Sequence, residues 1–398
     1  MSTRSRFPAV LSSPTQNLSI GAVLSTIVAV LSLLSLVWAG YWMVRAPYSG
    51  FDLTAGPPAS ITMVDPENPA ANLIQVGDLL LQIDGKLPLY ARDVSSLNYD
   101  DVRTLVLQNA QGVQVTVRIP LASPFSLNVF IDRFVPLFVS LVFWLSGLLV
   151  YALFARSGAD TLTASLYFAF CQLIVVYIAS VQAVGVLSLL VIRVSLVFGA
   201  WLAAVALHLH VRFPRSLLAM PVIRVGVVIS YAVALVVSIL VLSVLDDPAL
   251  LPVIDFVDYW LLLTLLGIII FMAMALIDKN NRESIFRARV VLVSTMAGLL
   301  PAMFLTMLPA LLMLPEYSIS PSRTFVFMGI VPVGYAYAIL RYRLLHYDGA
   351  VSRAIGSVIA IFLLIGLLAT VIVTLLISRI VPPGPTFVVW VLALTVVA

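Results

Sequence analysis

Long apolar runs separated by short polar stretches dominate the sequence. A helix needs about 20 mainly apolar residues to cross the hydrocarbon core of a bilayer. The runs of about this length cover residues 18–44, 128–154, 161–183, 186–210, 222–245, 257–277, 288–313, 323–341 and 354–379. A further run begins near Thr386 and is too short to span before Ala398, so we expect an incomplete last helix in a longer protein. The pattern predicts a multi-pass α-helical membrane protein with about 9–10 transmembrane helices.

The composition agrees with this class. Hydrophobic residues make up 62% of the chain and charged residues 10%, whereas a soluble domain carries about 25% charged residues. The net charge of +4 comes from basic residues in short loops, where such residues orient helices. We therefore expect the lipid bilayer, and not nucleic acid, as a partner. The single cysteine, Cys171, excludes a disulfide within one chain.

The charges of the loops predict one orientation. The first run is much longer than the 7–15 apolar residues that are typical of a signal peptide, and Arg4 and Arg6 precede it. We expect an anchor helix with a cytoplasmic N-terminus. Predicted cytoplasmic loops contain Arg156, Arg212, Arg215, Arg224, Lys279, Arg282, Arg287, Arg289, Arg341, Arg343 and Arg353. Predicted outer loops contain Asp246, Asp247, Asp255, Asp258 and Glu316.

We expect the protein in the inner (plasma) membrane, and this orientation divides its chain into four parts. We expect a cytoplasmic tail over residues 1–17 and a transmembrane anchor over 18–44. An extracytoplasmic module over 46–122 follows, and then a helical bundle over 128–398 whose last helix is truncated.

The module is the one long polar segment, and its pattern predicts an α+β fold. Gly77-Asp78 and Asp84-Gly85 form turns on either side of a buried strand, residues 79–83. Alternation of apolar and polar positions predicts two further strands. An amphipathic helix is predicted with Val102, Leu105 and Val106 on one face. The further elements are strands at 60–64 and 113–119, a turn with a short helical turn at 65–71, and the helix at 100–108.

This order resembles a bacterial PDZ domain. The family pattern combines a Pro-Ala turn, a Gly-Asp turn, an Asp-Gly turn and a last strand of alternating valines. The matching residues are Pro66, Pro69, Ala70, Gly77, Asp78, Leu80, Ile83, Asp84, Gly85, Val113, Val115 and Val117. The resemblance assigns the role of fold-defining turns to Gly77, Asp78, Asp84 and Gly85.

By resemblance, the module would bind an extended peptide by adding a strand to a sheet edge. The implied groove lies between the second strand and the helix, and its candidate residues are Ser60, Ile61, Met63, Val102 and Val106. Pro57 and Pro58 occupy the loop that captures a terminal carboxylate in the family, and proline has no backbone N–H to donate. Two interpretations stay open, a spacer domain with a degenerate groove and a domain that binds a peptide or a loop of the same protein.

The bundle contains no catalytic or metal-binding motif. His-Glu-x-x-His, Gly-x-Gly-Asp and Gly-x-Ser-x-Gly are all absent. His208 and His210 are two positions apart and therefore face different sides of a helix. We expect them to anchor a helix end at the membrane interface, with a conformational role as the alternative, and we expect no metal and no cofactor.

Three cytoplasmic junctions of the bundle are specific in sequence. They are His208 to Arg215, Arg287 to Pro301, and Pro332 to Leu345. Together with the anchor helix and the outer module, they resemble the membrane half of bacterial sensor histidine kinases that carry a PDZ domain. The acceptor histidine and the ATP-binding boxes of that family lie after the last helix, so the kinase domain is absent from this chain. Whether the parent protein is an enzyme therefore stays open, and a homodimer is a further expectation.

Charged residues near the outer ends of the spans are candidates for intramembrane polar contacts. Arg193 lies inside an apolar run, where a charge costs about 3 kcal/mol unless it is paired or reaches the interface. Asp255 and Asp258 are three positions apart and share a helix face. Arg193 could extend to the outer interface, pair with an outer acidic residue, or contact a ligand. The two aspartates could meet Arg193 or bind a cation, and a solvated helix end is the alternative.

The preferred function is the membrane receptor or sensor region of a bacterial signal-transduction protein. The expected ligand is an extracytoplasmic peptide or protein, a lipid, or a state of the envelope. The alternative is a transporter or membrane scaffold with an outer PDZ-like interaction domain. A transporter predicts inverted repeats and interrupted helices, and the sequence contains no convincing repeat.

Overall fold

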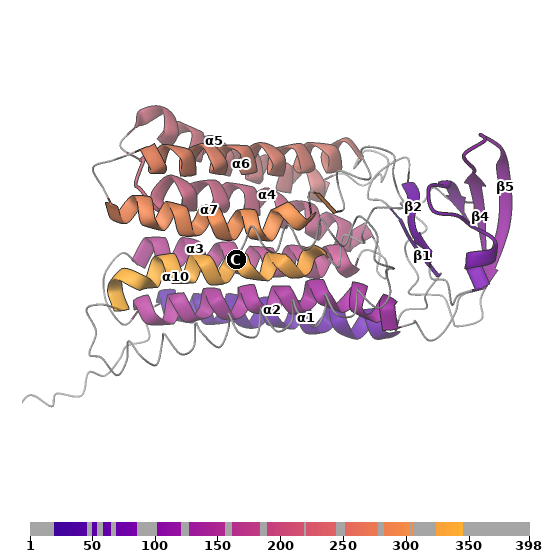
Figure 1. Cartoon of the computed structure of the whole chain (residues 1–398), viewed down its shortest axis with the longest axis horizontal. Coiled ribbons are helices and arrows are strands. Elements are labelled where there is room, and N and C mark those ends of the chain that lie inside the picture. The colour runs from indigo at the N-terminus through magenta and orange to yellow at the C-terminus, as the bar shows by residue number, and fades with distance from the viewer. Residues whose placement is uncertain are drawn as a thin grey trace, which may run out of the picture.

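The computed structural model describes a helical bundle with a small antiparallel sheet at one end (Figure 1). The described residues are 20–45, 50–53, 59–64, 69–85, 102–120, 127–155, 161–183, 189–218, 220–243, 251–277, 282–302, 304–305 and 324–344. The predicted run at 354–379 and the run that begins near Thr386 lie outside them.

The helices follow the apolar runs of the sequence. They are α1 (Ile20–Arg45), α2 (Leu127–Ala155), α3 (Thr161–Ala183), α4 (Leu189–Arg212), α5 (Pro221–Ser243), α6 (Leu251–Ile277), α7 (Arg282–Ala302), the 3₁₀ segment η5 (Phe325–Gly329) and α10 (Ile330–Leu344). Within the described residues, seven helices, α1 to α7, are long and apolar enough to cross a membrane. The prediction of a multi-pass helical membrane protein is confirmed at this level.

Helix α3 lies at the centre of the bundle. It packs against α1, α2 and α4, and α10 packs against α2 and α7. Tyr167, Cys171 and Val175 on α3 are fully buried. The outer faces of α1, α5 and α6 carry the exposed apolar side chains, as expected of helices that face lipid.

The sheet is an antiparallel meander in the order β1-β2-β3-β4-β5. Its elements are β1 (Phe51–Leu53), β2 (Ala59–Val64), η1 (Pro69–Asn72), β3 (Leu79–Ile83), β4 (Val102–Gln108) and β5 (Gln114–Pro120). The predicted strands at 60–64, 79–83 and 113–119 and the short helical turn are confirmed. A separate core of buried side chains, including Ile61, Leu80, Ile83, Leu105 and Ile119, holds the sheet together.

The hairpin of β4 and β5 is closed by side-chain capping. The Oδ1 atom of Asn109 accepts hydrogen bonds from the backbone N–H groups of Gln111 and Val113, at 3.1 and 2.9 Å. Gly112 has a φ of 78°, which glycine adopts at low cost. The turn fixes a register in which Leu105 pairs with Val117 and Gln108 with Gln114.

The helix predicted at residues 100–108 is wrong, because residues 102–108 form strand β4. Burial alternates along this strand, so that Leu105 is 0% exposed and Val102 is 57% exposed. The predicted apolar face of Val102, Leu105 and Val106 is therefore divided between the two sides of the sheet. Pairing with every residue of β5 outweighs the local helical pattern, since β preference depends strongly on such tertiary contacts.

Candidate functional site

The Gly77-Asp78 turn connects η1 to β3. Gly77 has a φ of 96°, a region that favours glycine. The N–H of Gly77 donates to the carbonyl of Ile61, and the N–H of Ile61 donates to the carbonyl of Asp78, both at 2.9 Å. The carboxylate of Asp78 accepts from the N–H of Gln75 at 2.9 Å. The turn thereby attaches β2 to the start of β3.

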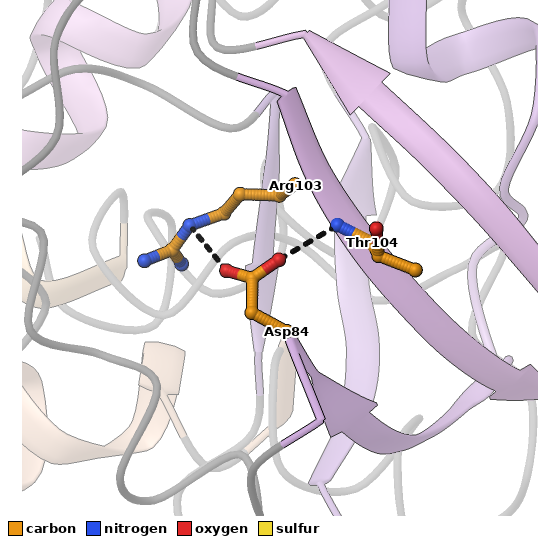
Figure 2. Close-up of polar contacts among 3 residues, drawn as sticks. All are labelled: Asp84, Arg103 and Thr104. Atoms are coloured by element: carbon orange, nitrogen blue, oxygen red, sulfur yellow. Dashed lines mark hydrogen bonds and ion pairs between the residues drawn. The ribbon is translucent and has the colours of Figure 1, made fainter.

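The Asp84-Gly85 turn follows β3, and Asp84 contacts the start of β4. The Oδ1 atom of Asp84 accepts a hydrogen bond from the N–H of Thr104 at 2.8 Å. Its Oδ2 atom lies 3.7 Å from Nε of Arg103, whose side chain is buried (Figure 2). Asp84 and Gly85 both have positive φ, 52° and 76°. One carboxylate therefore binds both a backbone donor and a buried cation across two strands.

The residues of the predicted groove do not face each other across one cleft. Ser60, Ile61 and Met63 lie on β2, Val102 and Val106 lie on β4, and strand β3 runs between the two strands. Ile61 belongs to the buried core. The described part of the predicted helix at 100–108, residues 102–108, is strand β4 and so does not border a groove as a helix would. Among the described strands, β1 and β5 are the two outermost in the order of the sheet.

A buried polar cluster lies inside the bundle, between α2, α3, α4 and α10. We call it the α10 cluster. Its members are Ser146 on α2, Tyr167 on α3, His210 on α4, and Pro332 and Tyr335 on α10. The side chains of these residues are all buried. Polar groups in the interior of a membrane bundle are costly and are commonly functional.

Three oxygen atoms of this cluster lie within hydrogen-bond distance of one another. The hydroxyl of Tyr167 donates to the carbonyl of Pro332 at 2.7 Å, and the hydroxyl of Ser146 donates to the same carbonyl at 2.9 Å. The two hydroxyl oxygens are 2.7 Å apart. Two protons serve three contacts, so one contact is always without a proton. The Pro332 carbonyl is thus held from α2 and α3 together.

His210 makes the second polar connection to α10. Its Nδ1–H donates to the carbonyl of Ala206 at 2.7 Å. This assigns the proton of the neutral ring to Nδ1, so that Nε2 accepts from the hydroxyl of Tyr335. The ring of Tyr335 stacks on Tyr167 at a centroid distance of 6.0 Å, and Phe170 lies edge-on to His210. These contacts orient the side chains of the cluster.

Helix α10 meets α7 at two glycines. A Cβ placed on Gly334 would lie 2.3 Å from the Cβ of Ser294. A Cβ placed on Gly298 would lie 2.6 Å from Cγ2 of Val331. Both distances are too short for real side chains. Glycine at these positions therefore allows the two helices to approach closely, as small residues do at membrane helix interfaces.

Helix α1 is connected to the same core. The hydroxyl of Ser32 contacts Oε1 of Gln172 on α3, and the indole N–H of Trp144 on α2 donates to the carbonyl of Ala29 at 2.8 Å. A Cβ placed on Gly147 would lie 2.7 Å from the Cβ of Cys171, so α2 and α3 also pack closely. Contacts therefore run from the helices that flank the sheet, α1 and α2, to α10.

The three charged candidates lie near one end of the bundle. Arg193 is in the second turn of α4 and is partly buried, and Asp258 near the start of α6 has an exposed side chain. Asp255 lies in the first turns of α6. Helices α4 and α6 pack against each other, and a Cβ placed on Gly199 would lie 3.1 Å from side-chain atoms of both Tyr177 and Val257. The structure thus brings Arg193 and Asp258 to the same end of neighbouring helices.

The prediction that both histidines are interfacial anchors is wrong for His210, which is buried within the bundle. A ring nitrogen of His208 lies 3.1 Å from the hydroxyl of Tyr231 on α5. Within the described residues, no group of three or more His, Cys, Asp or Glu side chains could hold a metal ion. The third histidine of the sequence, His346, lies outside the described residues.

The three junctions selected from the sequence meet in space. His210 belongs to the first, Gly298 to the second, and Pro332 and Tyr335 to the third. His210 contacts Tyr335, and Gly298 lies against Val331, next to Pro332. The sequence pattern marked these segments, but it gave no indication that they contact one another.

Comparison of the chain with protein-family models, with curated proteins and with solved structures finds no match.

Proposed function

We propose that the chain is the membrane receptor or sensor region of a bacterial signal-transduction protein, acting as the input half of a sensor histidine kinase. The single observation that carries this proposal is the set of buried contacts on α10. Ser146 and Tyr167 bind the Pro332 carbonyl, and His210 binds Tyr335. Helix α2, which follows the sheet directly in the chain, thereby contacts α10 through polar side chains.

The proposed mechanism is a change in how α10 packs. A ligand shifts a receptor only if it binds one of two conformations more tightly. A signal at the sheet would alter the relative position of α1 and α2, which flank it. Because two protons serve three contacts around Pro332, a small displacement can exchange one hydrogen bond for another without leaving a donor unpaired. Helix shifts of about 1–2 Å are a common form of such transitions.

The expected ligand is a peptide, a lipid or a state of the envelope outside the cytoplasmic membrane. The edges of β1 and β5 support peptide binding by strand addition. The predicted orientation, with a cytoplasmic N-terminus and the sheet outside, rests on the arginine-rich loops. Under this proposal α10 ends on the cytoplasmic side, where an output domain would act.

Distance measurements in the full chain test the proposal. Spin labels at Ala155→Cys and Leu344→Cys, in a Cys171→Ala background, report the ends of α2 and α10 in lipid nanodiscs. A peptide selected from a displayed library against the nanodisc-embedded chain serves as the ligand. We expect it to shift the distance by about 1–5 Å, and a scrambled peptide to leave the distance unchanged. Binding with no change in distance would refute the sensor function.

A transporter or scaffold is the second candidate function. Pro301 lies within α7, and the 3₁₀ segment η5 precedes α10. Interrupted helices of this kind form substrate sites in transporters. Peptide uptake into proteoliposomes, together with an unchanged α2–α10 distance, would favour this candidate. The coding sequence beyond residue 398 gives an independent test, because the kinase proposal requires an acceptor histidine and an ATP-binding domain there.

A further inference from the structure

Arginines surround the end of the bundle that lies away from the sheet. Helix α4 ends there, and α5 and α7 begin there (Figure 1). Within the described residues, Glu283 is the one acidic side chain at this end. We call this set the arginine rim, and its members are Arg212, Arg215, Arg224, Arg282, Arg287 and Arg289.

The rim is built on an ordered connection between α4 and α5. The N–H of Phe213 donates to the carbonyl of Leu209 at 2.7 Å, and the N–H of Leu217 donates to the carbonyl of Val211 at 2.8 Å. The side chains of Phe213 and Leu217 are buried. These contacts fix the backbone that carries Arg212 and Arg215.

Packing brings α7 beside this connection. The guanidinium of Arg287 lies 5.8 Å above the ring of Phe213, and it forms an ion pair with Glu283 one turn earlier on α7. Arg289, further along the same helix, has an exposed side chain. The six arginines of the rim and Glu283 together carry a formal charge of +5, from 6 − 1.

The start of α5 joins the rim to the lipid-facing surface. Arg224 has an exposed side chain whose Nε and Nη2 donate to the carbonyl of Leu218 at 3.3 and 2.9 Å. Val222 is 83% exposed, and Val225, Val228 and Ile229 continue an exposed apolar surface along α5. A positive group at the start of α5 thus lies next to an apolar helix face. A phospholipid has the matching arrangement, with a negative phosphate next to apolar acyl chains.

We infer that the arginine rim binds the phosphate groups of anionic phospholipids, with the acyl chains lying along α5. Guanidinium groups bind phosphate by short, charge-assisted hydrogen bonds. Anionic lipids are attracted by clustered basic residues at the membrane surface. The lipid would therefore fix the packing of the α4–α5 connection against α7.

Native mass spectrometry of the purified full chain tests this inference. The chain is titrated with phosphatidylglycerol and, separately, with phosphatidylcholine. The test variant is R224Q/R289Q, which removes two exposed charges from the rim. The matched control is R45Q/R118Q, which removes two charges from the end of α1 and from strand β5.

We expect the wild type to bind phosphatidylglycerol more tightly than phosphatidylcholine. The rim variant should bind phosphatidylglycerol about 25-fold more weakly, since each arginine near an anionic surface contributes roughly fivefold. The control variant should bind as the wild type does. Raising NaCl from 50 to 500 mM should weaken wild-type binding, because salt screens exposed charges; this measurement needs no variant and so does not depend on a variant's folding.

Three results would overturn the inference. They are equal binding of phosphatidylglycerol by wild type and rim variant, equal binding of the two lipids by the wild type, and equal loss in the control variant. Thermal stabilisation by inorganic phosphate alone, to the same extent as by phosphatidylglycerol, would assign the site to a soluble anion and overturn the lipid assignment.

Discussion

His210 on α4 and Tyr335 on α10 are in hydrogen-bond contact although 125 positions separate them in the chain. Both side chains are buried. The contact gives Nε2 of His210 its one donor, since the proton on Nδ1 is used by the carbonyl of Ala206. The pair is therefore a specific connection between two helices that are distant in sequence.

Replacement of Tyr335 by phenylalanine should destabilise the bundle by about 1 kcal/mol. The ring stacking on Tyr167 would remain, but Nε2 of His210 would lose its donor, and buried hydrogen bonds in membrane bundles contribute about 0.6–1.7 kcal/mol. Unfolding of the purified chain in mixed micelles measures the change. Tyr259→Phe is the matched control, because Tyr259 is 72% exposed. Equal stability of the two variants would contradict the assigned hydrogen bond.

The same variant also tests the proposed coupling. Y335F should still bind a selected peptide, because Tyr335 lies in the bundle and not in the sheet. The ligand-induced change between the labelled ends of α2 and α10 should become smaller. A full change in Y335F would mean that the His210–Tyr335 contact does not carry the signal.

Replacement of Asp84 by alanine should loosen the sheet much more than replacement by asparagine. Alanine removes the acceptor of the Thr104 N–H and the charge beside Arg103. Alanine also adopts the positive φ of 52° at this position less readily than aspartate does. Asparagine keeps an acceptor and tolerates this backbone conformation.

Hydrogen exchange of peptides that cover β4 measures this difference in the full chain. We expect exchange about 10- to 100-fold faster in D84A, corresponding to the loss of one hydrogen bond and of the charge partner of the buried Arg103. Exchange in D84N should stay close to that of the wild type. Similar exchange in both variants would show that the carboxylate is not what joins β3 to β4.

The substitutions V102K and L105K test whether residues 102–108 form a strand or a helix. In strand β4, Val102 points to solvent and Leu105 into the core, so L105K should disrupt the sheet by more than about 3 kcal/mol and V102K should change it by less than about 0.5 kcal/mol. The predicted helix would place both residues on one face, so both lysines would be disruptive. Limited proteolysis of the nanodisc-embedded chain measures how far the sheet is opened.

The sequence was sufficient to predict the helices of the bundle and three of the strands. Apolar runs of about 20 residues have few alternatives to a membrane helix, and the predicted run at 161–183 coincides with α3. The prediction for α7 began at residue 288, whereas the helix begins at Arg282. The arginines of its first turns lowered the local hydropathy, although arginine is a good helix former.

The α10 cluster could not be predicted in the same way. The burial of His210 depends on Tyr335, and no local pattern around residue 210 reports that contact. The helix predicted at residues 100–108 failed for a related reason. Val102, Leu105 and Val106 fit a helix face locally, and only pairing with residues 114–120 determines that the segment is a strand.

Adding a methyl group at Gly334 and removing the side chain of Ser294 tests the close packing of α7 and α10. Gly334→Ala should be strongly destabilising, because its Cβ would lie 2.3 Å from the Cβ of Ser294, and forced separation of packed helices costs about 1–3 kcal/mol. In the double variant G334A/S294G the obstructing atoms are gone. Glycine costs about 0.5 kcal/mol relative to serine in a helix, and alanine gains about 1 kcal/mol relative to glycine.

Unfolding in mixed micelles should therefore rank the double variant close to the wild type and G334A well below both. Gly226→Ala on α5 is the control, since a Cβ there meets nothing within 4 Å. If S294G fails to rescue G334A, the two helices are not in contact at these residues. Rescue would show that the lack of a side chain at residue 334 allows α10 to approach α7. The methyl group added on α10 would then be accommodated by removing the Ser294 side chain on α7 alone.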